Sequence, residues 1–269
     1  MKHSSKNPEN SGESVKDEVS ALARGLALLR VVADAPGPLT HRELGERTQI
    51  PKATVTRLAT TLQSAGYLRL VSGDRYSLGP AALHLGNAYL RGFDFRAEAR
   101  LHLAELAEMA AANVHLGVRD GLDILLIDTL RPQSALILSR MDIGSRMAIA
   151  TSAAGRAYLS ALPAPERAVL LEEIRAASGD DWPAVKSRLD AATAEFAEAG
   201  FCSSFGEWHP DIHALGFPLH GPRGELYAVS VGGPAYKLPR EMLLQKVAPK
   251  LLQVRRAIES EAGLGRLDQ

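Results

Sequence analysis

Residues 52–60 combine side chains that could bind a phosphate backbone. The stretch KATVTRLAT contains Lys52, Arg57 and several threonines, and it contains no acidic residue. Carboxylates would repel phosphates, whereas ammonium, guanidinium and hydroxyl groups can donate hydrogen bonds to phosphate oxygens. A guanidinium can also bind a guanine edge with two hydrogen bonds, and the methyl group of Ala53 or a threonine can touch a thymine methyl group. The composition of this stretch indicates a contact with nucleic acid.

Helical spacing would place these polar side chains opposite an apolar stripe. At about 100° per residue, the stripe comprises Val55, Leu58, Ala59, Leu62 and Ala65. The opposite face comprises Ala53, Thr56, Arg57 and Thr60, flanked by Lys52 and Thr54 in the first turn. Pro51 suits the start of such a helix and Gly66 its end. A threonine-rich surface alone is equally typical of a solvated helix, so the neighbouring elements must decide.

The neighbouring elements predict a winged helix-turn-helix over residues 20–79. A helix over 20–35 has Ser20 as a candidate N-cap, and PGP at 36–38 ends it. Thr40 and Glu43 form a capping box for a short second helix. After the third helix, strands at 67–71 and 75–78 flank Ser-Gly-Asp, which predicts a hairpin.

Charge supports a DNA-binding assignment for this segment. Residues 20–79 contain eight Arg and Lys and four Asp and Glu, a net charge of +4 in a chain of net charge zero. On this interpretation Arg69 and Arg75 of the wing contact the DNA backbone or minor groove, and Arg24 contacts a phosphate.

The remainder of the chain predicts an α+β domain. A linker helix over 80–93 leads to a helix over 94–113, and a hairpin over 114–130 turns at Asp-Gly. A third strand is expected at 134–141, two strands lie between 201 and 234, and a closing helix spans 240–263. Helices are also expected at 151–162, 164–177 and 182–200. This pattern favours an antiparallel sheet of five or six strands flanked by helices, over residues 94–264.

The composition points to a cytoplasmic protein. Residues 1–19 are polar and predict a disordered tail rather than a signal peptide. No apolar run is long enough for a transmembrane helix. Cys202 is the single cysteine, which fits a reducing compartment, and we expect it to be a buried small hydrophobe.

The sequence resembles the IclR family of bacterial transcription regulators. The resemblance is carried by LTHRELGERTQIPKATVTRLATTLQSAGYL and YSLGPAALHLG in the first part, and by IATSAAGRAYLSAL and GFPLHGPRGELYAVSVGGP in the second. It implies a winged helix-turn-helix, a linker helix and a GAF-like effector domain. It also implies dimers, or dimers of dimers, that bind a palindromic operator and respond to a small molecule, frequently a carboxylic acid. No cofactor is expected.

The resemblance also implies an effector site on the open face of the sheet. The implied residues are Leu136, Ser139, Met147, Ser152, Ala153, Ala154, Gly155, Ser204, Glu207, Ile212, Ala214, Ser230 and Gly232. The segment GEWHPDIHALGFPL departs from the family pattern and adds Trp208, His209 and His213 near the pocket mouth. Trp208 could stack on a ring and the histidines could pair with a carboxylate. Alternatively, Trp208 fills core and both histidines lie on the rim.

Two other classes of function stay open at this point. Glu207, His209 and His213 could hold a metal in a hydrolase of a small metabolite, although His-Pro breaks the helix that such a spacing needs. A scaffold that binds DNA without any effector is the other alternative.

Overall fold

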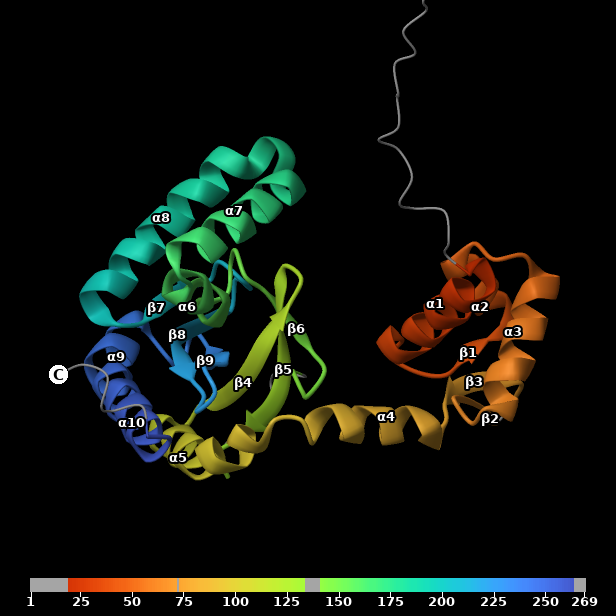
Figure 1. Cartoon of the computed structure of the whole chain (residues 1–269), viewed down its shortest axis with the longest axis horizontal. Helices are drawn as coiled ribbons and strands as arrows, with labels where there is room; N and C mark the ends of the chain where they lie inside the picture. The colour runs from red at the N-terminus through yellow and green to blue at the C-terminus, as the bar shows by residue number, and fades with distance from the viewer. Residues whose placement is uncertain (1–18, 72, 134–140, 264–269) are drawn as a thin grey trace, which may run out of the picture. The chain divides into compact units, whose positions relative to one another are not determined.

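The computed structural model describes residues 19–71, 73–133 and 141–263. The chain divides into two compact units, residues 1–92 and 93–269, and each is described by itself (Figure 1). The strand predicted at 134–141 falls almost wholly outside the described residues, as do the candidate effector residues Leu136 and Ser139.

The first unit is a winged helix-turn-helix followed by a further helix. Its elements are α1 (Ser20–Asp34), β1 (Leu39–Thr40), α2 (His41–Thr48), α3 (Lys52–Ser64), β2 (Leu68–Val71), β3 (Arg75–Leu78) and α4 (Pro80–Leu90). Leu28, Leu44 and Val55 are fully buried, so the apolar faces of α1, α2 and α3 share one core. The sequence did not predict β1, which adds a third antiparallel strand in the order β1-β3-β2.

Local contacts fix the ends of these helices. The capping box predicted for α2 is confirmed, because Thr40 accepts from the Glu43 amide while the Glu43 carboxylate accepts from the Thr40 amide. The N-cap predicted for α1 is wrong. Ser20 already lies in the helix, and Val19 precedes it in an extended conformation without a side-chain cap.

The helix predicted as a linker is anchored to the end of α3. The Gly79 amide donates to Tyr67 O at 2.7 Å, and the Ala81 amide donates to Gly66 O at 3.2 Å. A Cβ atom at Gly79 would lie 2.2 Å from Gly66 O, so this close approach requires glycine. The start of α4 is therefore held on the helix-turn-helix core.

The second unit has helices on both faces of an antiparallel sheet. Its helices are α5 (Asp94–Ala110), α6 (Ala153–Ala161), α7 (Ala164–Ser178), α8 (Trp182–Ala199), α9 (Arg240–Met242) and α10 (Ala248–Glu261), with a 3-10 turn at Gly179–Asp181 and a π-helical turn at Leu243–Val247. Its strands are β4 (Asn113–Asp120), β5 (Asp123–Leu130), β6 (Arg146–Ala148), β7 (Cys202–Phe205), β8 (Ile212–His220) and β9 (Leu226–Pro234). The described strands follow the order β6-β5-β4-β9-β8-β7, which confirms the predicted sheet and adds β6.

Two boundaries differ from the sequence-based expectation. The helix predicted over 94–113 ends at Ala110, because Ala111 takes a left-handed conformation with φ of 48° and β4 begins two residues later. The closing helix predicted over 240–263 is interrupted by a π-helical turn just before Pro249. Proline lacks the amide that would continue the regular hydrogen bonding, so the interruption lies where the helix is weakest.

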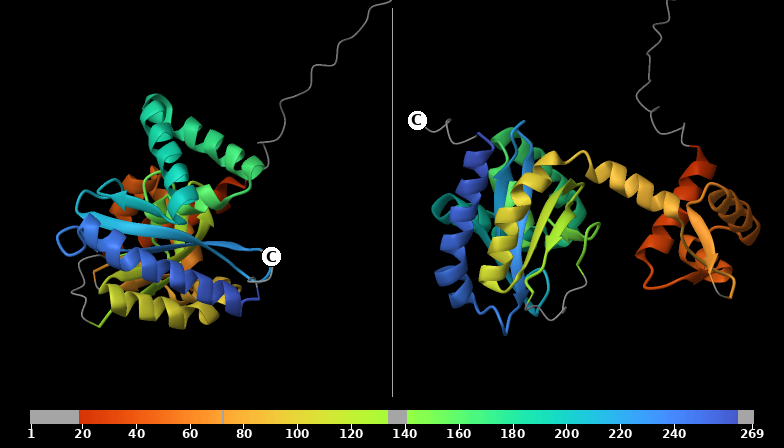
Figure 2. Two further views of the ribbon diagram at one scale, coloured as in Figure 1. Left: turned by 90° about the vertical axis from the view of Figure 1, so that its left-hand side faces the viewer. Right: turned by 90° about the horizontal axis from the view of Figure 1, so that it is seen from below.

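Alternation along the strands separates two faces of the sheet. α5 and α10 lie side by side on one face, and α6 lies on the other with α7 and α8 further out (Figure 2). Tyr227 on β9 faces α5, and its ring lies 5.2 Å from that of Phe95 on α5 and 6.3 Å from that of Phe93 just before the helix. The next residue, Ala228, packs in the core cluster with Ala154 of α6. The face that α6 covers carries the candidate site.

Candidate functional site

The predicted amphipathic division of α3 is present in the structure. Val55 and Ala59 are fully buried, and Leu58 and Leu62 pack against the same core. Ala65, which we expected on this stripe, ends the helix and is exposed. The opposite side is open to solvent: Lys52, Ala53, Thr56, Arg57 and Thr60 are exposed, and Thr54 is half-buried.

Four hydroxyl groups of α3, from Thr56, Thr60, Thr61 and Ser64, donate to carbonyls of the helix itself. Thr56 Oγ1 donates to Lys52 O at 3.1 Å, and Thr60 Oγ1 donates to Thr56 O at 2.9 Å. Thr56 or Thr60 must therefore break its hydrogen bond to the carbonyl four residues earlier before its hydroxyl can donate to DNA. His41, at the start of α2, lies with Nε2 2.9 Å from Thr56 Oγ1. No sequence pattern indicates this contact, because it depends on how α2 crosses α3.

Four of the predicted DNA-binding cations are available for a partner. Arg24, Lys52, Arg57 and Arg69 are exposed, and within the described part of the chain none has an ion-pair partner. Arg75 differs, because it does not extend from the wing as expected. Its Nη1 lies 2.9 Å from Pro38 O and 3.4 Å from Glu43 Oε2, so it ties β3 to the start of α2.

A cavity of about 780 Å³ opens on the α6 face of the sheet. Its walls are mainly apolar, and one carboxylate and one ammonium group, those of Asp211 and Lys237, lie exposed among the lining residues. The predicted effector residues that line it are Met147, Ser152, Ala153, Ser204, Trp208, His209, Ile212, Ala214, Ser230 and Gly232. They come from β6 to β9, from the start of α6 and from the segment between β7 and β8, which are far apart in sequence.

The N-terminus of α6 reaches this cavity at Ser152 and Ala153. Ser152 caps the helix by accepting from the Gly155 amide at 3.1 Å, and the backbone carbonyl of Ala148 accepts from its hydroxyl at 2.7 Å. The first amides of a helix lack intrahelical partners and favour an anion. A Cβ atom at Gly216 of β8 would lie 2.3 Å from the backbone of Ala153, so glycine lets the helix start rest on the sheet.

Four predicted effector residues do not line the cavity. Ala154 packs in the core, and a Cβ atom at Gly155 would lie 2.3 Å from Ile149 Cα in the segment after β6. His213 Nδ1 lies 2.9 Å from Leu238 O, and its ring packs edge-on against Phe205. Glu207 is turned toward a buried arginine.

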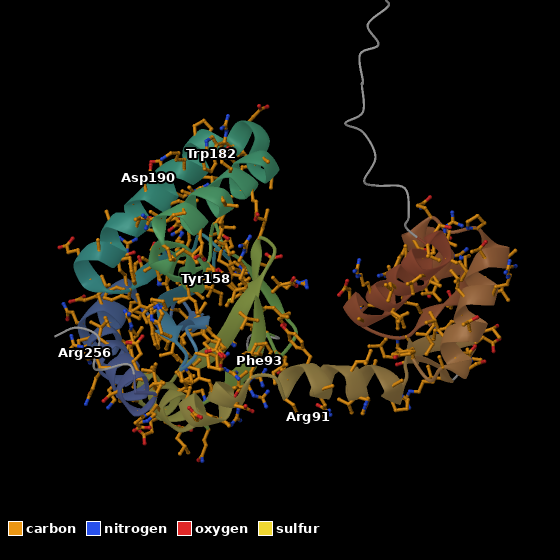
Figure 3. All side chains as sticks on the ribbon, in the orientation of Figure 1. Arg91, Phe93, Tyr158, Trp182, Asp190 and Arg256 are labelled. Carbon is orange, nitrogen blue, oxygen red and sulfur yellow. The ribbon has the colours of Figure 1, made fainter. Side chains whose placement is uncertain are left out.

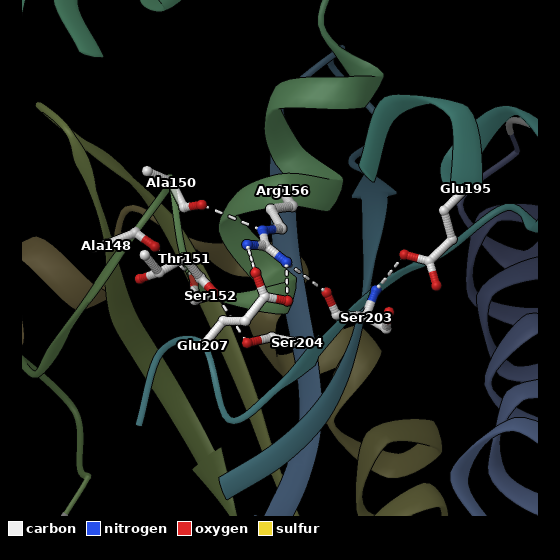
Figure 4. Close-up of polar contacts among 9 residues, drawn as sticks. All are labelled: Ala148, Ala150, Thr151, Ser152, Arg156, Glu195, Ser203, Ser204 and Glu207. Carbon is white, nitrogen blue, oxygen red and sulfur yellow. Dashed lines mark hydrogen bonds and ion pairs between the residues drawn. The ribbon is translucent and has the colours of Figure 1, made fainter. Parts of the chain in front are cut away.

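Arg156 binds Glu207 and holds the segment after β7 (Figure 4). Its side chain is only 4% exposed. Nη1 donates to Glu207 Oε1 at 2.8 Å and to Ser203 O at 3.1 Å, and Nη2 donates to Glu207 Oε2 at 2.5 Å. Hydrogen bonding from Arg156 lowers the pKa of Glu207 below its ordinary value. The basic residue directly after Gly155 was a sequence signal that the prediction did not use.

This geometry does not favour the metal-site alternative. Both Glu207 oxygens bind Arg156, and His213 Nδ1 is used by a backbone carbonyl. Over residues 19–71, 73–133 and 141–263, no group of three His, Cys, Asp or Glu is placed to hold a metal ion. Cys202 is buried, as expected, and burial raises the pKa of its thiol to about 12.

His115, which was not among the predicted site residues, lies on β4 in the cavity wall and is 7% exposed. Its Nδ1 lies 3.2 Å from Thr129 Oγ1. Burial, followed by the nearby Arg131, lowers the pKa of His115 to about 4. The ring is therefore neutral near pH 7. A histidine between Val114 and Leu116 in a predicted strand must face away from both, and that alternation was the available signal.

No helix in the described part of the chain is long and apolar enough to span a membrane.

Both units match known families along their length. Residues 21–72 match the IclR helix-turn-helix domain, and residues 87–260 match the bacterial transcriptional regulator IclR C-terminal domain. The chain is 30% identical to the HTH-type transcriptional regulator TsaQ1/TsaQ2 of Comamonas testosteroni, over 95% of this chain and 93% of that protein. It is 28% identical to the Pca regulon regulatory protein of Pseudomonas putida, over 89% and 83% of the two chains.

Solved structures agree with these matches. An IclR family transcriptional regulator from Brucella abortus is 35% identical and superposes with a TM-score of 0.77, covering 94% of this chain and 96% of that one. An IclR homolog from Microbacterium hydrocarbonoxydans, crystallised with 4-hydroxybenzoate, shares the fold with a TM-score of 0.71 at 19% identity, covering 90% and 99%. These relatives are regulators rather than enzymes, which removes the hydrolase alternative. The chain belongs to the IclR family of ligand-responsive bacterial transcription regulators, with a DNA-binding helix-turn-helix unit and a C-terminal effector unit.

Proposed function

We propose that a small carboxylic acid, aromatic acids included, binds in the cavity on the α6 face and controls binding of a palindromic operator. The observation that carries this proposal is the composition of the cavity. The N-terminus of α6 enters a largely apolar space at Ser152 and Ala153, beside Trp208. The helix end suits a carboxylate, and the apolar walls suit a ring. An effector acts by binding the DNA-competent and DNA-incompetent states with different affinities.

In this proposal the operator contacts are made by the exposed side chains of the first unit. Lys52, Ala53, Thr54, Thr56 and Arg57 enter the major groove on α3, while Arg69 and Arg24 bind the backbone. Arg75 organises the wing through Pro38 and Glu43 rather than reaching outward. The site of action is the cytoplasm, where chromosomal DNA is.

Exposed apolar side chains support a homodimer or a dimer of dimers. Leu22 and Leu26 on α1 are 63% and 45% exposed, and Leu83 and Leu85 on α4 are 67% and 55% exposed. No residue of α4 is buried within the described structure. A second copy of the chain could cover such exposed leucines. Light scattering after gel filtration should give a dimer or tetramer for the wild type and a smaller species for L26E/L83E.

A thermal-shift screen followed by gel shifts tests the effector. Benzoate, 4-hydroxybenzoate and aliphatic keto and hydroxy acids are added to the full chain, and a binding acid raises the melting temperature. The same acid should change the affinity for DNA from upstream of the gene at fixed salt. If no carboxylic acid raises the melting temperature, the proposed effector class is wrong.

A further inference from the structure

A row of paired residues crosses the α6 face of the sheet from β8 to β5, and its two central members, Ser230 and His115, line the cavity. The strand register pairs Gly216 with Ser230, Ser230 with His115, and His115 with Thr129. The N-terminus of α6 rests on Gly216 at one end of this row. His115 lies two strands from Gly216, which is roughly 10 Å at about 4.8 Å per strand.

Ser230 and His115 have hydrogen-bonding atoms that the protein does not use. Ser230 is 5% exposed and His115 is 7% exposed. Among the described residues, neither Ser230 Oγ nor His115 Nε2 has a hydrogen-bond partner, whereas His115 Nδ1 lies beside Thr129. Every fully enclosed side-chain nitrogen or oxygen in the described chain does have a partner. Both atoms must therefore contact the open space of the cavity that their residues line.

These two groups suit a neutral polar substituent rather than a second anion. A serine hydroxyl and a neutral imidazole can each donate or accept one hydrogen bond, but neither carries charge. A buried carboxylate placed here would lose its hydration without gaining a cation from either group. A hydroxyl group would satisfy both, because it can donate to one and accept from the other.

We propose that His115 and Ser230 determine effector specificity by hydrogen-bonding a neutral hydroxyl group at the end of the effector remote from its carboxylate. With the carboxylate at the N-terminus of α6, an aromatic ring spans the intervening strands. This inference rests on the proposed effector site and narrows it to hydroxylated aromatic acids.

Isothermal titration of the full chain with benzoate and 4-hydroxybenzoate tests this inference. The two acids differ only in the hydroxyl group, so the ratio of their dissociation constants measures its recognition. A site built around a hydroxyl group disfavours the analogue that lacks it. We expect the wild type to bind 4-hydroxybenzoate about tenfold more tightly.

Variants assign that preference to the two side chains. H115L should remove most of the preference and leave the affinity for benzoate within about twofold, because benzoate has no hydroxyl group for His115 to bind. A structural defect would instead weaken the binding of both acids. H115Q keeps a neutral hydrogen-bond donor and acceptor, so it should retain part of the preference that H115L loses. S230A should reduce the preference, whereas the matched control S160A should not, because Ser160 on α6 is similarly buried but does not line the cavity.

The outcomes separate this inference from the proposal on which it rests. If the wild type binds both acids equally, or if H115L and S230A keep the full preference, His115 and Ser230 do not read the hydroxyl group. If the wild type binds neither acid, an aromatic acid effector is wrong, and the inference falls with it. A defect of H115L in binding both acids, together with an unchanged preference in S230A, would also overturn it.

Discussion

Replacing Glu207 with alanine should destabilise the second unit and leave the first unit unchanged. The substitution leaves the Arg156 guanidinium, which is 4% exposed, without the carboxylate that accepts from both Nη1 and Nη2. Removing one partner of a buried ion pair costs about 3–5 kcal/mol. Because the Glu207 side chain is 34% exposed, water can reach the site, and we expect a loss of about 2–3 kcal/mol.

The loss should depend on pH. Hydrogen bonding from Arg156 lowers the pKa of Glu207 below its ordinary value of 4.5. A carboxyl group whose pKa is lower in the folded than in the unfolded state stabilises the fold above the unfolded value. That contribution is lost as the pH falls through the folded value. The difference in stability between wild type and E207A should be full at pH 7 and should shrink below about pH 4.5.

Tryptophan fluorescence can follow this unit alone. The two tryptophans of the chain, Trp182 and Trp208, both lie in the second unit. For a unit of this size, a loss of 2–3 kcal/mol lowers the melting temperature by about 5–10 °C. D190A is the matched control, because Asp190 bonds the exposed Lys186 on α8 and such pairs contribute less than about 1 kcal/mol (Figure 3). Equal melting temperatures for E207A and D190A would refute the role given to Arg156.

Two further predictions concern the first unit. R57A should weaken operator binding by about 1–3 kcal/mol and relax base preference at one position, whereas R30A on the exposed side of α1 should do neither. If R57A binds the operator as tightly as wild type in gel shifts at fixed salt, this prediction is wrong. T40A should lose about 1 kcal/mol of stability, because it removes the Thr40 side chain that accepts from the Glu43 amide in the capping box. Thermal unfolding followed by circular dichroism measures this loss. An unchanged melting curve for T40A would show that the cap does not limit the stability of α2.

Short-range patterns were sufficient to predict the helices and the hairpin of the DNA-binding unit. The 3.6-residue period placed Val55 in the core and Arg57 outside, and Thr40 with Glu43 marked a helix start, because these effects act within one or two turns. The positive charge of the wing was predictable from residue types, but the hydrogen-bond partners of Arg75 were not. That side chain binds Pro38 O, a group 37 residues away, and no local rule specifies such a contact.

The lining of the cavity on the α6 face was predicted in part, because the family resemblance indicates which residues lie near the site but not where their side chains point. Ser152, Ala153 and Ser230 line the cavity as expected. Glu207 does not, because Arg156 approaches from α6, 51 residues earlier, and binds both of its oxygens. His115 was not predicted, because the role of a histidine in a strand depends on which face of the sheet its side chain points to.

The sequence by itself determined the classes of the helices and strands, the polar and apolar faces of α3, and the family. Each depends on spacing along one segment, where hydrogen bonding and burial follow a fixed period. Only the tertiary structure decided which face of the sheet α6 covers, which polar groups remain unpaired in the cavity, and which cations are free. Those outcomes depend on contacts between β4, β9 and α6, whose packing is set by the whole unit.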